Sequence, residues 1–262
     1  MFHYAKALLG YGPRLLATYF FKMKRWAKHL DKYPTEQRFI KIRKIMRNIS
    51  HALQVDITVF GLENLPTDTN FLMVSNHLSA FDPIPFMINY QKPLTFVGKK
   101  ELMKAPFIPV AMQVVEGVFL DRDNLRQSLK VMLSVEDDLR KGEKSWMIFP
   151  EGTRRRDKLL PVAEFHHGTF RPGMKANVPI VPAASYGTFR VLKRKPQFKR
   201  YPVYISFLKP FYPEDYAGLH TSDMATLTRK AIQREITYHL RPLDHKVMSE
   251  KKEKHYRFDK LY

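Results

Sequence analysis

The 262-residue sequence contains no cysteine. Disulfide bonds, cysteine-ligated zinc and a thiol nucleophile are therefore excluded, and a reducing, intracellular compartment is compatible with this composition. No apolar run approaches the roughly 18 uncharged residues that a membrane-spanning helix requires. The first ten residues lack the basic start and the long apolar core of a secretory signal peptide, so none is expected. Any membrane association is predicted to occur at the membrane surface.

Acidic residues are scarce, because 25 Asp and Glu face 45 Lys and Arg, giving a formal net charge of +20. An excess of this size favours an anionic partner, such as nucleic acid, anionic lipid or a phosphorylated substrate. Nucleic acid is the least supported of these, since the sequence has no Cys/His finger, glycine-aromatic RNA motif or helix-turn-helix spacing. The hydrophobic content of 44% excludes a disordered chain and predicts one main domain.

Residues 1–50 carry much of the excess charge, with twelve basic residues against two acidic ones. Their apolar residues recur every three or four positions, which predicts two basic amphipathic helices. The apolar positions are Leu15, Leu16, Tyr19, Phe20, Met23, Trp26, Ala27 and Leu30, then Phe39, Ile42, Ile45, Met46, Ile49 and Leu53. Pro34 separates the two helices, and Asp31 or Thr35 is expected to cap the second one.

Two interpretations of this helical pair stay open. In the first, it docks on an anionic membrane surface, with aromatic side chains in the acyl boundary and basic side chains on the headgroups. The side chains concerned are Phe20, Phe21 and Trp26, together with Lys22, Lys24 and Arg25. In the second interpretation, both helices pack on the core and expose a solvated basic face. The predicted organisation is a docking segment at 1–54, a domain at 55–243 and a charged tail at 244–262.

From residue 55 onward, short apolar runs alternate with helical patterns. This alternation predicts an α/β domain, and the continuously apolar runs predict a mixed, mostly buried sheet flanked by helices. The predicted strands are 55–61, 70–76, 94–98, 117–123, 145–152, 178–185 and 203–208. One helix within 121–144 is expected to bury Leu125, Leu129, Met132, Leu133 and Leu139. Another at 221–240, capped by Thr221 or Ser222, is expected to bury Met224, Leu227, Ile232, Ile236 and Leu240.

Residues 75–83, SNHLSAFDP, carry the first candidates for catalysis. A strand that ends near Ser75 places His77 at the carboxyl edge of the sheet, where α/β folds usually bind ligands. Pro83 suits the first turn of a helix, so Asp82 is predicted at its N-cap. The intervening turn could fold the carboxylate onto the imidazole, fixing its tautomer and raising the basicity of the other nitrogen. The alternative is a helix cap beside a structural histidine.

Three further stretches follow predicted strands or form one. FPEGTRRR (149–156) offers a carboxylate, a glycine and arginines suited to holding a phosphate, and GVFLDRDN (117–124) adds Arg122. The prolines of NVPIVPAA (177–184) predict an edge strand or a strand end. Taken singly, each has an ordinary structural explanation: solvated arginines, a local ion pair, or a common edge strand.

In this order, NHLSAFD (76–82), GVFLDRD (117–123), FPEGTR (149–154) and VPIVPA (178–183) resemble the four blocks of the glycerolipid acyltransferases, specifically the 1-acyl-sn-glycerol-3-phosphate (lysophosphatidic acid) acyltransferase family. The resemblance implies transfer of a fatty acyl group from acyl-CoA or acyl carrier protein to the sn-2 hydroxyl of lysophosphatidic acid. It implies no metal or other cofactor, and a peripheral, monotopic location on the cytoplasmic face of a membrane. Alternatives are another lysophospholipid or glycerol 3-phosphate as acceptor, or a non-catalytic basic protein on a membrane surface.

The same resemblance implies roles for individual residues. His77 corresponds to the general base and Asp82 to its orienting partner. The acceptor-binding positions are Arg122, Glu151, Gly152, Thr153 and Arg154, and the acyl-donor block is Val178, Pro179, Ile180, Val181 and Pro182. The stretch EFHHGTF (164–170) departs from the family pattern, because His166 or His167 stands where a lysine is common. Backbone N–H groups near the turn or at a helix start are expected to stabilise the oxyanion, and Ser79 keeps an acyl-enzyme route open.

Overall fold

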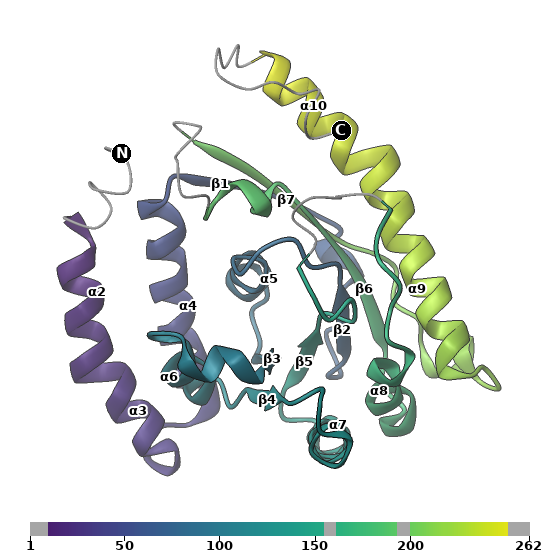
Figure 1. The fold of residues 1–262 in the computed structure, drawn as a ribbon, viewed down its shortest axis with the longest axis horizontal. Coiled ribbons are helices and arrows are strands. Elements are labelled where there is room, and N and C mark those ends of the chain that lie inside the picture. The colour runs from purple at the N-terminus through teal and green to yellow at the C-terminus, as the bar shows by residue number, and fades with distance from the viewer. Residues whose placement is uncertain (1–9, 155–160, 193–199, 251–262) are drawn as a thin grey trace.

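A seven-stranded sheet in the order β1-β7-β6-β2-β5-β3-β4 runs through the centre of the molecule (Figure 1). The computed structural model describes residues 10–154, 161–192 and 200–250. The strands are β1 (Val55–Phe60), β2 (Leu72–Ser75), β3 (Leu94–Lys99), β4 (Val118–Leu120), β5 (Ser145–Ile148), β6 (Ile180–Tyr186) and β7 (Tyr201–Phe207). All neighbouring pairs are parallel except the antiparallel pair of β6 and β7. The prediction of a mixed sheet is confirmed.

Helices cover both faces of the sheet. Successive side chains of a strand point to opposite faces, so a continuously apolar strand presents apolar side chains on both faces, and both must be buried. In β2, Leu72 and Val74 pack in one apolar cluster while Met73 packs in the other. The first cluster receives side chains from α7 (Leu125–Lys141), α9 (Thr221–Glu235) and the segment around α8 (Arg171–Ala176). The second receives them from α3 (Lys24–Lys28), α4 (Thr35–Ala52), α5 (Pro83–Asn89) and α6 (Ile108–Val114). Burial on both faces explains the continuously apolar strands.

Of the two alternatives predicted from its prolines, β6 is not an edge strand, because it lies between β7 and β2, whereas Pro179 does mark a strand end, directly before Ile180. Pro182 pairs with Val74 of β2, and its carbonyl accepts a hydrogen bond from the N–H of Leu208 at 2.9 Å. The N–H and C=O of a strand residue point to the same side, so the missing donor of Pro182 faces β7. The antiparallel pairing with β7 ends at Phe207, one residue away, and this local irregularity accommodates the proline.

Both predicted N-terminal helices are present. The first consists of α2 (Gly12–Thr18), a π-helical turn (Tyr19–Met23) and α3, and the second is α4. The predicted cap of α4 is wrong, because Pro34 occupies the N-cap without a side-chain hydrogen bond. Thr35 instead donates its hydroxyl hydrogen to Glu116 Oε1 at 2.9 Å. Within the described ranges, no helix combines the length and apolar character needed to cross a bilayer.

The second helix belongs to the core. Phe39, Ile42 and Ile45 of α4 are buried in the same cluster as Met73 of the central strand β2. Trp26 joins this cluster and is only 7% exposed, so the prediction that its ring lies in the acyl boundary is wrong. Amphipathic spacing identifies the apolar side of a helix but does not reveal whether protein or lipid covers it. Phe20 and Phe21, at 54% and 78%, do stay exposed.

The covered side of α7 also differs from the prediction. Leu139 is buried as expected, but Leu125, Leu129 and Leu133 are 83%, 51% and 41% exposed. The helix carries a second apolar stripe, and it is this one that faces the sheet through Val131 and Val135.

The C-terminal helix begins at Thr221, within the predicted range, but it has a different cap and continues past its predicted end. His220 is the N-cap of α9 in a capping box with Asp223, in place of Thr221 or Ser222. Of the residues predicted to be buried, Leu227 is 41% exposed, whereas Met224, Ile232, Ile236 and Leu240 are buried. A π-helical turn (Ile236–Leu240) leads into α10 (Arg241–Glu250), which the yellow end of the ribbon shows (Figure 1).

A buried ion pair fixes α10 to the rest of the domain. Asp244 and Arg190 have fully buried side chains, and Arg190 Nη1 donates to Asp244 Oδ1 at 2.7 Å. Residues 244–250 are therefore part of the folded domain, and the predicted tail starts too early. Residues 251–262 lie outside the described residues.

An ion-pair network joins α4 to the start of β4 and β5. Glu116 accepts hydrogen bonds from Arg38 of α4 and from Lys144 Nζ at 2.7 Å. Burial disfavours the charged carboxylate, but these donors outweigh burial and lower the pKa of Glu116 to about 2. Arg38 is itself only 2% exposed, and Glu116 compensates its buried positive charge.

The variant Glu116→Gln should lower the free energy of unfolding at pH 7 by on the order of 2 kcal/mol. Since the folded pKa lies below the ordinary value of 4.5, the stabilisation is complete above that pH and is lost as the pH falls toward 2. Urea unfolding measures this free energy for the variant and for the native protein. The difference between the two proteins should be large at pH 7 and smaller at pH 3. Glu101→Gln, at an exposed ion pair, is the control. An equal difference at both pH values would contradict the charge argument.

Candidate active site

The predicted site residues follow strands that run in the same direction. The strands β2, β5, β3 and β4 are mutually parallel, so their carboxyl ends meet at one edge of the sheet. His77 follows β2, Arg122 follows β4, and Glu151 and Gly152 follow β5. The structure thus brings residues of three separate sequence blocks to one edge.

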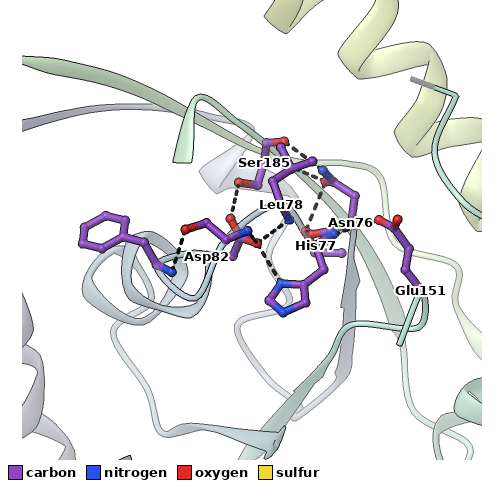
Figure 2. Close-up of polar contacts among 9 residues, drawn as sticks. Asn76, His77, Leu78, Asp82, Glu151 and Ser185 are labelled. Atoms are coloured by element: carbon purple, nitrogen blue, oxygen red, sulfur yellow. Dashed lines mark hydrogen bonds and ion pairs between the residues drawn. The ribbon is translucent and has the colours of Figure 1, made fainter. Parts of the chain in front are cut away.

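His77 and Asp82 form a direct pair (Figure 2). Asp82 precedes α5 as predicted, but its side chain makes no cap bond and turns back toward β2. Its Oδ2 lies 2.8 Å from His77 Nδ1 and accepts the N–H groups of Leu78 and Ser79, each at 2.7 Å. An ionised carboxylate only accepts, so Nδ1 carries the proton and Nε2 is the basic nitrogen. The alternative of a mere helix cap beside a structural histidine is not what this geometry shows.

Ser185 of β6 also contacts the Asp82 carboxylate. Ser185 donates its hydroxyl hydrogen to the other oxygen of Asp82 at a long 3.4 Å. The side-chain amide of Asn76 makes two hydrogen bonds to the backbone of Ser185: its oxygen accepts the Ser185 N–H at 2.8 Å, and its nitrogen donates to the Ser185 carbonyl at 2.9 Å (Figure 2). Sequence patterns missed Ser185. Its position becomes apparent only from the register of β2 and β6, which pairs Ser75 with Ala183 and so places Asn76 near Ser185.

Glu151 and Phe149 fix the histidine from β5. Glu151 is 5% exposed, and its Oε1 accepts the backbone N–H of His77 at 2.8 Å. The Phe149 ring stacks on the imidazole, with centroids 4.3 Å apart and planes 25° apart. Glu151 therefore holds the turn that carries His77, and its role in acceptor binding stays a prediction. Phe149 was not anticipated from the sequence.

The expected oxyanion-stabilising N–H groups of this turn are already engaged. The N–H groups of His77, Leu78 and Ser79 all point to carboxylate oxygens of Glu151 or Asp82. These three N–H groups are therefore not available to an oxyanion, and stabilisation by other N–H groups near the turn or at a helix start stays a prediction. Ser79 is also buried, and its hydroxyl accepts the N–H of Phe81 at 3.2 Å, which disfavours the acyl-enzyme route.

Arg122 reaches from β4 to the turn after β5. Its guanidinium donates to the carbonyl of Gly152, and burial lowers its pKa, although an arginine stays charged at neutral pH. Gly152 has a φ of +70°, and a Cβ there would lie 2.6 Å from Arg122 Nη1, so glycine alone fits. Thr153 is exposed and Arg154 is partly buried nearby. The arginines at 155 and 156 lie outside the described residues.

The acyl-donor block does not reach this edge. Its five residues are buried in or next to β6, where Val178 and Ile180 pack in one core cluster and Val181 in the other. The stretch 164–170, which departs from the family pattern, contains two histidines. His166 donates its backbone N–H to the carbonyl of Pro150 at 3.0 Å, and the side chain of His167 contacts that of Thr221 at 3.2 Å. A role of these residues in donor binding stays a prediction.

Comparison with known proteins places these observations in a family. The acyltransferase family model matches residues 56–186. A probable 1-acyl-sn-glycerol-3-phosphate acyltransferase from Mycoplasma pneumoniae is 28% identical over 74% of this chain and 76% of its own length. The 1-acyl-sn-glycerol-3-phosphate acyltransferase from Borreliella burgdorferi is 29% identical over 57% of this chain, a match that spans 59% of that relative.

A solved structure has the same fold. The crystal structure of the 1-acyl-sn-glycerophosphate (LPA) acyltransferase from Thermotoga maritima superposes with a TM-score of 0.65 at 24% identity. The superposition covers 89% of this chain and 91% of that one. The superposition extends into residues 1–54, because 89% of this chain is more than residues 55–262 can supply.

Proposed function

The chain belongs to the acyltransferase family, and from this premise we propose that it transfers a fatty acyl group to the sn-2 hydroxyl of lysophosphatidic acid, giving phosphatidic acid. The acyl donor is a thioester, acyl-CoA or acyl carrier protein. The names of the relatives support the acceptor. The observation that carries the chemistry is the bond from His77 Nδ1 to the buried Asp82, because it leaves Nε2 as a base.

The reaction needs one proton moved twice. His77 Nε2 takes the proton of the acceptor hydroxyl as its oxygen attacks the thioester carbonyl carbon. A new C–O bond forms, the carbonyl oxygen becomes an oxyanion, and the collapse of this intermediate breaks the C–S bond. The departing thiolate receives the proton from the imidazolium. Asp82 stabilises the imidazolium while it exists, and no covalent acyl-enzyme is required.

The acceptor phosphate fits the Arg122 side of this edge. Guanidinium groups bind phosphate through paired N–H donors, and Arg122 uses one nitrogen on Gly152 while its side chain stays partly exposed. Holding the phosphate there would orient the hydroxyl toward His77, and orientation of this kind lowers the barrier by several kcal/mol.

The proposed location is the cytoplasmic face of a membrane, with a peripheral, monotopic attachment. Phe20 and Phe21 are exposed on the first helical segment, beside the basic residues Lys22, Lys24 and Arg25. Lys24 Nζ lies 4.6 Å from the centre of the Phe20 ring. Apolar rings with adjacent cations suit the boundary between acyl chains and anionic headgroups, so anionic lipid rather than nucleic acid is the proposed partner.

The proposed function is tested by incubating the purified chain with labelled acyl-CoA or acyl carrier protein and lysophosphatidic acid. Labelled phosphatidic acid is the expected product. Formation of product from glycerol 3-phosphate alone would overturn the acceptor. Binding to anionic vesicles without any acyl transfer would favour a non-catalytic membrane-surface protein.

The variant Arg122→Ala should raise the KM for lysophosphatidic acid about 10-fold or more, since a charged hydrogen bond contributes about 1.5–3 kcal/mol. The KM for the acyl donor should stay near its native value. Arg122→Lys should restore affinity only in part, because lysine supplies charge without the planar fork. Arg126→Ala, at an exposed position on α7, is the matched control. A selective rise in the KM for the donor would reassign Arg122 to donor binding.

A further inference from the structure

Two segments next to the catalytic edge expose large apolar side chains. The strands β3 and β4 are parallel to β5, so the residues that follow them share the edge of His77. Met103 and Phe107, after β3, are 60% and 40% exposed, and Leu125, after β4, is 83% exposed. We call these three residues the edge cluster. Exposed apolar side chains gathered at a functional edge mark an interaction surface.

The backbone at Phe107 is strained. Its φ is +67° with a ψ of −30°, a conformation that bulky residues rarely adopt and that glycine adopts freely. The Phe107 ring is held edge-on against Tyr19, with centroids 4.7 Å apart. Strain of this kind persists where the surrounding structure imposes it, and it often coincides with function.

The contact with Tyr19 makes the edge cluster continuous with the exposed aromatic residues of the N-terminal segment. Phe20 and Phe21 follow Tyr19 directly, and Lys24 Nζ lies 5.4 Å from the centre of the Tyr19 ring. Lys104 adds an exposed cation beside Met103. Lys99 and Lys100 contribute less charge, because each is paired with a nearby carboxylate.

We propose that the edge cluster is a second contact with the bilayer, which enters the acyl boundary and holds the catalytic edge at the depth where a lipid acceptor presents its hydroxyl. This inference rests on the proposed function, since only a lipid substrate requires that edge to meet a bilayer. An anionic bilayer is the occupant because exposed cations flank the apolar side chains on the N-terminal segment and at Lys104.

The test compares the double variant Met103→Ser, Phe107→Ser with the native chain on two forms of acceptor. On anionic vesicles that contain lysophosphatidic acid, turnover should fall about 10-fold and co-sedimentation should weaken. With a short-chain, monomeric lysophosphatidic acid in solution, turnover should stay native, because the chemistry is intact. Leu62→Ser is the matched control: Leu62 is 47% exposed but follows β1, which runs opposite to β2 and ends at the other edge.

The outcomes separate the two proposals. No turnover of the native chain on either acceptor would reject the proposed function itself. Native vesicle turnover by the double variant, or an equal loss on both acceptors, would overturn the membrane role of the edge cluster. Loss of a native dimer with unchanged vesicle binding would also overturn it and would indicate a second copy as the occupant.

A single variant distinguishes the membrane role from stability. Phe107→Gly removes the ring and relieves the positive φ, so its Tm should equal or exceed the native value. Its turnover on vesicles should nevertheless fall, with native turnover on the soluble acceptor. Native vesicle turnover by this variant would show that the ring at Phe107 has no part in membrane contact.

Discussion

Replacing His77 with alanine should abolish nearly all acyl transfer while the protein remains folded. Loss of a general base costs about 10²–10⁴ in rate. The imidazole is partly exposed, at 17%, and its contacts are with Asp82 and the Phe149 ring, so removal leaves the core clusters intact. The kcat with lysophosphatidic acid and the thermal unfolding of the same preparation measure the two effects.

His51→Ala provides the matched control for this variant, since His51 is exposed on the last turn of α4 and belongs to neither the His77–Asp82 pair nor the residues that hydrogen-bond to it. It should have native kcat and native Tm. A kcat of His77→Ala within a few-fold of the native value would reject His77 as the base.

Replacing Asp82 with asparagine should lower kcat by about 10²-fold or more with little change in stability. The asparagine oxygen can still accept the N–H groups of Leu78 and Ser79, and its amide N–H can donate to the Ser185 hydroxyl. The negative charge that stabilises the imidazolium is lost. A KM near the native value would accompany the fall, because Asp82 itself does not contact the substrate in the proposed mechanism.

The double variant of His77 and Asp82 should be little worse than His77→Ala alone. Residues that act as one unit are strongly non-additive, since removing the base leaves its partner nothing to stabilise. Multiplicative losses in the double variant, or full activity in Asp82→Asn, would show that Asp82 does not act through His77.

The architecture of the sheet was predictable because each strand is short, apolar and bounded by turn residues. All seven predicted strands are present. The central position of β6 was not predictable, because Pro182 argues for an edge in isolation and is accommodated only by the end of β7. The order of strands depends on such long-range pairings, which local patterns do not encode.

The sequence also could not predict which apolar side of a helix is covered by the rest of the protein. Trp26 and Leu129 both occupy the apolar side of an amphipathic helix, yet Trp26 is 7% exposed and Leu129 is 51% exposed. The periodicity is the same in both helices. Only the packing of whole layers decides which stripe meets the sheet.

The residues with evident chemistry in the candidate site were predictable, whereas the residues that hold them in place were not. His77, Asp82 and Arg122 are residue types with evident chemistry at the ends of strands, so their approach could be anticipated. Ser185 and Phe149 are ordinary residues within apolar runs. Their contacts with Asp82 and His77 depend on strand register and on the turn after β5, which become visible only in three dimensions.

The position of β1 has a consequence for how the chain is made. This strand lies at the edge of the sheet and pairs with β7, which is synthesised roughly 150 residues later. At about 5–20 residues per second, the ribosome leaves β1 without this partner strand for on the order of ten seconds. The amphipathic helices emerge before the sheet, and their apolar side is uncovered until the strands and helices of their core cluster follow. The edge of β1 therefore stays unpaired during synthesis, and the sheet can close on that side only after every other described strand has been made.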